Sequence, residues 1–252
     1  MQATYEEQQN TLGWFRARLG NITGSAVGNL MGKARSKDAA WSSTAESYLQ
    51  QLAFERAMDT DIVNNDDLFG QYIELTNVKS KAIEWGHKQE GNAANLFAAN
   101  FQPLYEPDAE YFQLSLEEPP SVKSKELLHF ASSPDRMFAN PVTGEECCVE
   151  IKSPQGKAFA KYASITLLST QEERLEALKK AEVNYYWQLF AHMLATETSK
   201  CYWVIFNPFA TNPLYTMEVT RDEDIINELR EKIVKADQYI EQFVAKLKGN
   251  GK

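Results

Sequence analysis

The chain has 252 residues, of which 43% are hydrophobic and 24% charged, a composition typical of a globular protein that can bury a substantial core. A net charge of −9, taken alone, counts against nucleic-acid binding, which needs local positive charge. Three cysteines, two of them adjacent, argue against a disulfide framework and indicate a reducing, cytosolic compartment. The polar N-terminus lacks the apolar core of a signal peptide, and no apolar run approaches the length needed to span a bilayer, so neither feature opposes the expected cytoplasmic location.

The first half of the chain is predicted to be mainly helical. The strongest periodicity runs over 77–101, where residues at intervals of three and four line one face. After a turn at Gly20-Asn21, Thr23 or Ser25 is expected to cap a short helix. The expected elements, in chain order, are helices over 5–18, within 22–31, over 43–58 and over 77–101, with a basic loop at 33–38 and a loop at 59–70.

The second half of the chain is predicted to contain the strands. Pro141 and Gly144 mark a turn between two of them, and the continuous apolar run 201–206 suits a central position in a sheet. Since no Pro/Gly/Ser-rich linker divides the chain, we expect one α/β domain over 1–252, with a central mixed sheet flanked by helices. The expected elements are strands over 104–116, 127–131, 136–139, 145–151, 201–206 and 214–219, a two-part helix over 172–196 and a terminal helix over 222–247.

Two carboxylates and a lysine stand out on these strands. Asp135 follows Pro134, and Glu150 lies two residues before Lys152 on the strand after the turn. Facing side chains of antiparallel strands lie about 5 Å apart, and residues two apart on a strand share a face, so all three should converge. Carboxylates suit Mg²⁺, for which Mn²⁺ could substitute, and a lysine can activate water or balance charge in a transition state.

Each part of this pattern also has an ordinary structural interpretation. Asp135 could be a turn residue after proline, and Glu150 could be a surface residue of a strand. However, Glu150 and Lys152 interrupt an apolar strand, and a buried charge needs a partner or a metal ion. The histidines are too scattered for a zinc motif and are predicted to be structural or exposed; they are His87, His129 and His192.

Four segments resemble lambda-type exonucleases and YqaJ-like phage recombinases of the PD-(D/E)xK nuclease superfamily. Pro134-Asp135 with Glu150-x-Lys152 resembles the PD-(D/E)xK core. Trp14–Ser25 is similar to the family's W-x(3)-R-x-G-x-I-T-x-S segment, and Glu84–Ala93 to its W-G-x(3)-E-x-x-A helix. Tyr186–Leu189 resembles the start of a Y-x-x-Q-x-Q helix, with Ala191-His192 in place of the second polar position. The resemblance covers residues 12–220 in the same order.

The resemblance implies a metal centre and a catalytic group. Asp135 and Glu150 would be metal ligands, helped by the backbone carbonyl of Ile151. Glu90, on the long helix, would be a further acidic ligand or would support the others. Lys152 would be the catalytic lysine.

The remaining matches imply substrate contacts. Gln188 would position the water or the scissile phosphate beside the lysine. Arg18 and Ser25 would bind the 5′-phosphate end of the substrate, because a guanidinium can clamp a phosphate through two donors and a hydroxyl near a helix start adds another. Arg35, in the basic loop, would be a weaker DNA contact.

The function implied by the resemblance is a Mg²⁺-dependent exonuclease that degrades the 5′-ended strand of linear double-stranded DNA. The 3′-ended strand left behind would pass to a single-strand annealing protein for recombination. Relatives form a trimeric ring that threads DNA, so a homo-oligomer is expected, acting as a phage or prophage protein in a bacterial host. A basic channel inside an acidic protein would reconcile DNA binding with the charge of −9.

Two alternatives stay open at this point. The first is another PD-(D/E)xK enzyme, such as a restriction-type endonuclease; a relative with an iron–sulfur centre does not fit three cysteines of which two are adjacent. The second is a non-catalytic scaffold that keeps the fold and binds a protein partner.

Overall fold

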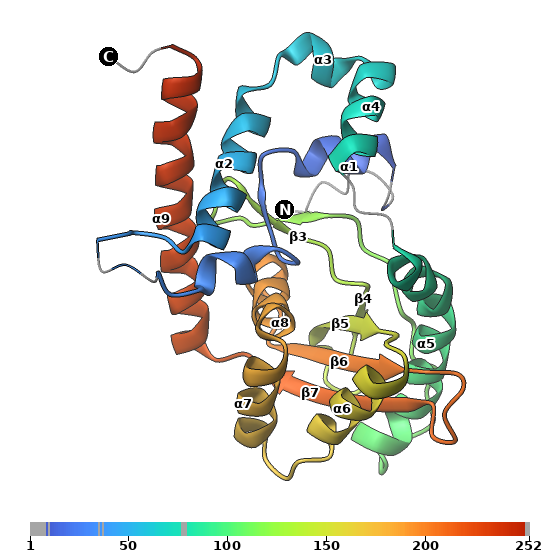
Figure 1. Ribbon diagram of the computed structural model, residues 1–252. Helices are drawn as coiled ribbons and strands as arrows, with labels where there is room; N and C mark the ends of the chain where they lie inside the picture. The colour runs from blue at the N-terminus through green and yellow to red at the C-terminus, as the bar shows by residue number, and fades with distance from the viewer. Residues whose placement is uncertain (1–8, 10, 35, 37, 77–79, 250–252) are drawn as a thin grey trace.

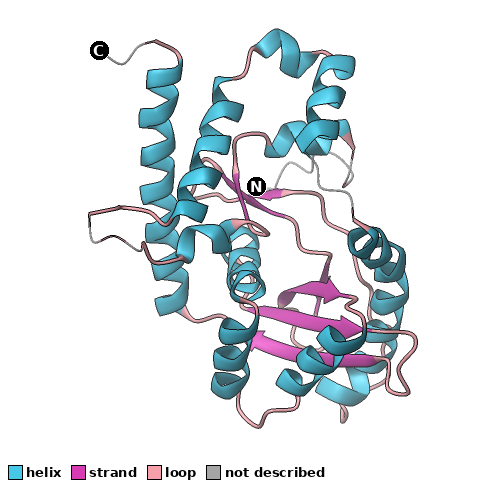
Figure 2. Cartoon of the chain, in the orientation of Figure 1, coloured by secondary structure: helices cyan, strands magenta, loops and turns pink. Residues whose placement is uncertain are grey.

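The computed structural model describes residues 9, 11–34, 36, 38–76 and 80–249. Its strands form a four-stranded sheet and a three-stranded sheet, with helices around both (Figures 1 and 2). In Figure 1 the four-stranded sheet lies at the bottom, and the long C-terminal helix α9 (Glu223–Leu247) rises along the left side. Among the described residues, no helix combines the length and the hydropathy that crossing a membrane requires.

The four-stranded sheet has the order β4-β5-β6-β7. β4 and β5 are antiparallel, β5 and β6 are parallel, and β6 and β7 are antiparallel, so the sheet is mixed. The parallel pair needs a crossover, which three helices provide. The strands are β4 (Arg136–Ala139), β5 (Glu146–Lys152), β6 (Lys200–Phe206) and β7 (Leu214–Thr220), and the crossover helices are α6 (Gly156–Thr166), α7 (Gln171–Ala181) and α8 (Val183–Thr196).

The two faces of this sheet pack against different helices. On one face, Val149 and Tyr202 join a cluster with Phe97 of α5 (Lys81–Tyr105). On the other face, Cys148 and Trp203 join a larger cluster that includes α8 and α9. Each large apolar side chain buried in this way stabilises the fold by about 1.5–3 kcal/mol. The predicted central mixed sheet flanked by helices is confirmed, and β6 lies inside it as its apolar sequence predicted.

The three-stranded sheet brings the N-terminal motif beside the segment that leads to β4. Its order is β1 (Ile22–Thr23), β3 (Phe130–Ser132), β2 (Val122–Lys123). The Gly24 amide donates to the Ala131 carbonyl at 3.0 Å, and a Cβ at Gly24 would lie 1.9 Å from Ser132 Oγ. Glycine is therefore needed where the two segments meet.

The N-terminal helices form the upper part of the molecule, with α2 packed along α9 (Figure 1). Helix α1 begins at Leu12; residues 5–8 and 10 of the predicted helix 5–18 lie outside the described residues, as do 77–79 of the predicted helix 77–101. The elements are α1 (Leu12–Arg18), η1 (Val27–Met31), α2 (Ser43–Ala57), α3 (Thr60–Asn64) and α4 (Asp66–Thr76).

The loop predicted over 59–70 is wrong, because two helices occupy it. Asp59 caps α3 by accepting from the Asp61 amide, and Asn65 Oδ1 accepts from two amides at the start of α4. Asp and Asn side chains are favourable at a helix N-terminus, and Asp59 and Asn65 therefore mark two helix starts.

Two further expectations need correction. The strand predicted over 104–116 is wrong: α5 continues to Tyr105, and the following residues reach the sheet through a bridge between Glu117 and Met137. Leu114 is nevertheless buried, although it does not pair as part of a strand. Neither Thr23 nor Ser25 caps a helix, since Thr23 lies in β1 and Ala26 is the N-cap of η1.

Candidate active site

A cavity of about 670 Å³ opens where β4 begins and β5 ends, within the size range of ligand sites. Its walls come from the first turns of α5, the end of β5 with the loop after it, α6 and α8. Four of the predicted site residues line it: Glu90, Asp135, Ile151 and Lys152.

Asp135 lies at the entrance to β4. The register that pairs Arg136 with Val149 places Asp135 opposite Glu150 when it is continued by one residue. One carboxylate oxygen of Asp135 accepts from the Ile151 amide at 2.6 Å. Burial and the negative charge of Glu150 raise the pKa of Asp135 well above its ordinary value. Two carboxylates in this position therefore favour a bound cation.

Glu150 is almost fully buried, with 1% of its surface exposed. Lys152 Nζ donates to one carboxylate oxygen, and His192 Nε2 lies 2.7 Å from the other. Burial alone would raise the pKa of Glu150, but Lys152 and His192 outweigh it and lower the pKa to about 2. Glu150 is therefore ionised and held at both oxygens.

Lys152 contacts buried Glu150 and also lines the cavity. Its ammonium lies 4.7 Å from the ring centre of Tyr185 on α8, and both side chains line the cavity. Burial lowers the pKa of Lys152, but the carboxylates of Glu150 and Asp135 raise it above its ordinary value. The ammonium is therefore charged at neutral pH.

His192 connects the site to the three-stranded sheet. Its Nδ1 lies 2.8 Å from Ser132 Oγ, and both residues are buried. Because Glu150 is ionised and can only accept, His192 Nε2 carries a proton and donates to it, while Nδ1 pairs with the Ser132 hydroxyl. The histidines were predicted to be structural or exposed, and the position of His192 in the Tyr186–His192 segment was the only signal in the sequence for this contact.

Glu90 faces the cavity but is paired with an arginine. Arg136 Nη1 donates to Glu90 at 2.5 Å and also to the backbone carbonyl of Asp135. Among the described residues, Glu90, Asp135 and Glu150 do not offer one carboxylate oxygen each such that all three lie within 4.8 Å of one another. Sequence reasoning missed Arg136, which follows Asp135 directly.

Gln188 is buried in α8, with 7% of its surface exposed. It lies three residues after Tyr185 and four before His192, so all three share one face of the helix. That face meets Lys152 through Tyr185 and Glu150 through His192. Gln188 therefore lies on α8 between Tyr185, which contacts Lys152, and His192, which contacts Glu150, but it does not line the cavity.

Arg18 and Ser25 are brought together beside Ser133. Arg18 donates to Ser133 Oγ at 2.9 Å and to Ser25 Oγ at 3.5 Å, and its guanidinium lies 4.1 Å from a ring centre of Trp14. Burial lowers the pKa of Arg18 to about 10. Both hydroxyl partners are neutral, which leaves the positive charge available to an anion. Arg35 lies outside the described residues.

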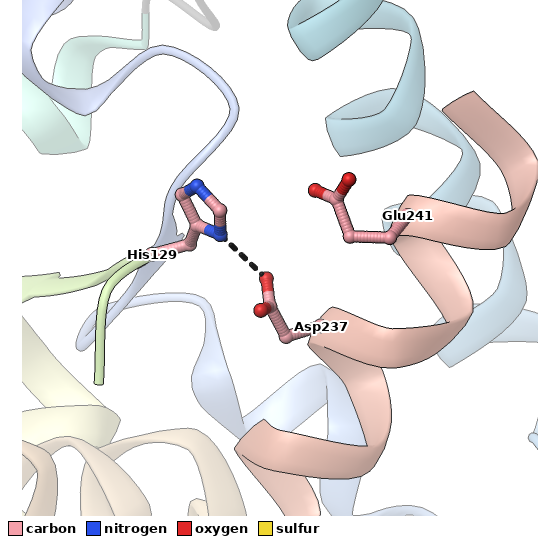
Figure 3. A group of neighbouring side chains, drawn as sticks. All are labelled: His129, Asp237 and Glu241. Carbon is pink, nitrogen blue, oxygen red and sulfur yellow. Dashed lines mark hydrogen bonds and ion pairs between the residues drawn. The ribbon is translucent and has the colours of Figure 1, made fainter. Parts of the chain in front are cut away.

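The donor set suits a hard divalent cation. Asp135 and Glu150 supply carboxylate oxygens, and the raised pKa of Asp135 reflects excess negative charge that a cation would relieve. A separate group of His129, Asp237 and Glu241 has ligand atoms within 4.8 Å of one another (Figure 3). There, Arg56 Nη1 lies 2.7 Å from both carboxylates, so the positive charge of the Arg56 guanidinium already pairs with that cluster.

The family model of the YqaJ-like viral recombinase domain matches residues 13–199, most of the chain. The chain belongs to this family. No curated protein matches the YqaJ-like chain.

Solved structures share the fold of the YqaJ-like chain. An alkaline exonuclease, LHK-Exo from Laribacter hongkongensis, aligns over 94% of this chain and 96% of its own, with 19% identity and a TM-score of 0.65. LHK-Exo in complex with dAMP gives the same values. A phage-related exonuclease from Haemophilus somnus 129PT aligns over 90% and 96%, with 15% identity and a TM-score of 0.54. The predicted PD-(D/E)xK-like fold is confirmed.

Proposed function

We propose that this protein is a Mg²⁺-dependent deoxyribonuclease that degrades the 5′-ended strand of linear double-stranded DNA and leaves a 3′ single strand for recombination. The observation that carries the proposal is the cavity in which Asp135, Ile151 and Lys152 meet beside buried Glu150. The YqaJ-like family and the fold shared with an alkaline exonuclease support it.

Asp135 and Glu150 would hold the metal ion, with the carbonyl of Ile151 and with Glu90 nearby. When bound, Mg²⁺ supplies Lewis-acid stabilisation of the phosphate and a more acidic water. Mn²⁺ would substitute, because it also accepts oxygen ligands. His192 keeps Glu150 ionised and fixed, and Arg136 keeps Glu90 near the cavity.

Lys152 is charged, so its role in this proposal is to orient the attacking water and to offset negative charge that develops on the phosphate. Gln188, on the α8 face that meets Lys152 and Glu150, would support the same position. Both roles need a fixed side chain. Gln188 is buried on α8, and Lys152 contacts the same helix through Tyr185.

Arg18 and Ser25 would bind the 5′-terminal phosphate, together with Ser133. A terminal phosphate carries more charge than an internal diester, and Arg18 offers paired donors beside two hydroxyls. Ser133 lies two residues before Asp135. A phosphate bound by Ser133 would therefore be positioned relative to the metal site by the short segment 133–135. Arg35 stays a predicted further DNA contact.

The proposed assembly follows the family. A trimeric ring with a basic channel would allow an acidic chain to hold DNA, and a single-strand annealing protein would receive the 3′ strand. The chain would act as a single nuclease domain in the cytoplasm of a bacterial host.

A second candidate is an endonuclease of the same fold, which the shared metal-site pattern would also allow. Matched substrates separate the two: linear duplex with a 5′-phosphate, the same duplex with a 5′-hydroxyl, and supercoiled plasmid. We expect fast digestion of the first, much slower digestion of the second and none of the third. Equal rates on all three would leave only an endonuclease. Mg²⁺ binding without turnover would indicate a non-catalytic scaffold.

The Arg18→Ala variant tests the phosphate site on the same substrates. It should lose most of the preference for 5′-phosphate while keeping residual cleavage. Arg16→Ala is the matched control, since Arg16 lies on the same helix but pairs with Asp66. A phosphate preference unchanged in Arg18→Ala would remove Arg18 from this role.

A further inference from the structure

An exposed aromatic ring lies beside the active-site cavity. Phe209, in the loop between β6 and β7, is 80% exposed. Its ring stacks on Trp85 of α5, with ring centres 5.6 Å apart and 13° between the planes. Trp85 itself lines the cavity with Asp135 and Lys152. A single exposed hydrophobic residue is ordinary on a protein surface, so the significance lies in the fixed stack and its position.

The loop that carries Phe209 is held in place. The Phe209 amide donates to Asn207 Oδ1 at 3.0 Å, and Asn207 Nδ2 donates to the Pro154 carbonyl at 2.9 Å. Asn207 is buried, and Pro154 also lines the cavity. The ring is thus anchored to the cavity wall from two sides, through Trp85 and through Asn207.

Positive charge lies on the same wall. Lys81 comes from the turn of α5 before Trp85, and Lys152 comes from β5. Proteins that bind single-stranded nucleic acid combine cationic side chains for the backbone with aromatic rings for the bases. The exposed ring of Phe209 offers one open face, which is enough to stack against one base.

We infer that the Phe209–Trp85 stack is a nucleobase platform, on which a base of the DNA strand in the cavity stacks against the outer face of Phe209. The inference rests on the proposed nuclease function and adds to it a contact with the base, independent of sequence. Since every base has a π-face, the platform would serve a nuclease that degrades any sequence.

The test uses duplex DNA with a short single-stranded 5′ end, bound in Ca²⁺ to prevent cleavage. 2-Aminopurine is placed at each of the first three nucleotides in turn, and its fluorescence and the Kd are measured. At one of these positions, binding of the wild-type protein should change the 2-aminopurine fluorescence. Phe209→Ala should show no such change and should bind with a roughly tenfold weaker Kd, because the stacking contact is lost. Phe209→Tyr should keep both the fluorescence change and the Kd, because it keeps an aromatic ring. Tyr111→Ala is the control, because Tyr111 is 89% exposed in a loop away from this cavity.

A second arm replaces the same nucleotide with an abasic site. Wild type should then bind as weakly as Phe209→Ala, and the variant should show no additional loss on the abasic DNA. If wild type binds and cleaves DNA but Phe209→Ala matches it at all three positions, the platform is wrong and the ring serves another partner, such as a protein. Failure of wild type to bind or cleave DNA would instead defeat the proposed function.

Discussion

At the scale of single residues, the site depends on a buried carboxylate that is held at both oxygens. Glu150 is 1% exposed, and such burial is costly unless the charge is paired. Lys152 and His192 provide the pairing, and Ser132 fixes the ring of His192 from the far side. We expect His192 to be a positioning residue, which acts on the metal through Glu150.

Substitution of His192 tests this role. His192→Ala should weaken Mn²⁺ binding by 10-fold or more, a typical loss of about 10–100-fold when a partner of a metal ligand is removed. His192→Gln keeps a donor and should restore part of the affinity. Calorimetric titration with Mn²⁺ measures this separately from cleavage. If both variants bind the ion like wild type, His192 has only a packing role.

The two predicted carboxylate ligands should respond differently to substitution. Asp135→Asn and Glu150→Gln should each abolish cleavage, because each removes a metal ligand. Asp135→Asn relieves charge crowding and should keep or raise the melting temperature. Glu150→Gln removes the charge that Lys152 pairs with and should destabilise the fold by about 1.5–3 kcal/mol. Thermal unfolding beside nuclease assays shows the contrast; near wild-type cleavage by either folded variant would refute the ligand assignment.

At the scale of elements, the strands around Asp135 and Glu150 were predictable. The turn at Pro141-Gly144 and the apolar runs on either side place Asp135 opposite Glu150, and the register agrees. The helices α3 and α4 were missed, because their capping residues are the same polar residues that favour loops. The contacts of Arg136 and His192 could not be predicted, since both depend on how helices α5 and α8 lie on the sheet.

The contact between β1 and β3 gives an element-scale prediction. Gly24→Ala would place a Cβ 1.9 Å from Ser132 Oγ, the partner of His192. We expect a loss of about 1–3 kcal/mol in stability, as for other overpacked sites, and weaker metal binding. Gly70→Ala in α4 is the control, because its Cβ would meet nothing within 4 Å. Equal melting temperatures for wild type and Gly24→Ala would contradict the close packing.

At the scale of the whole molecule, an acidic chain must concentrate its basic groups to hold DNA. If three copies surround a channel, light scattering should give about three times the mass of one 28.6 kDa chain. DNA affinity should fall steeply with salt, because each phosphate contact releases counterions. A monomer at micromolar concentration, with DNA affinity independent of salt, would contradict both the ring and the channel.

The most direct test of the central claim follows the two strands of one duplex. Linear 5′-phosphorylated DNA is labelled separately at a 5′ end and at a 3′ end and digested in Mg²⁺, then in EDTA, with Asp135→Asn as a control for contaminating nuclease. We predict mononucleotides from the 5′ label at once, a 3′-labelled strand that stays long, and no product in EDTA or with Asp135→Asn. Early release of the 3′ label, internal fragments from the first minutes, or cleavage that persists in EDTA would contradict the account.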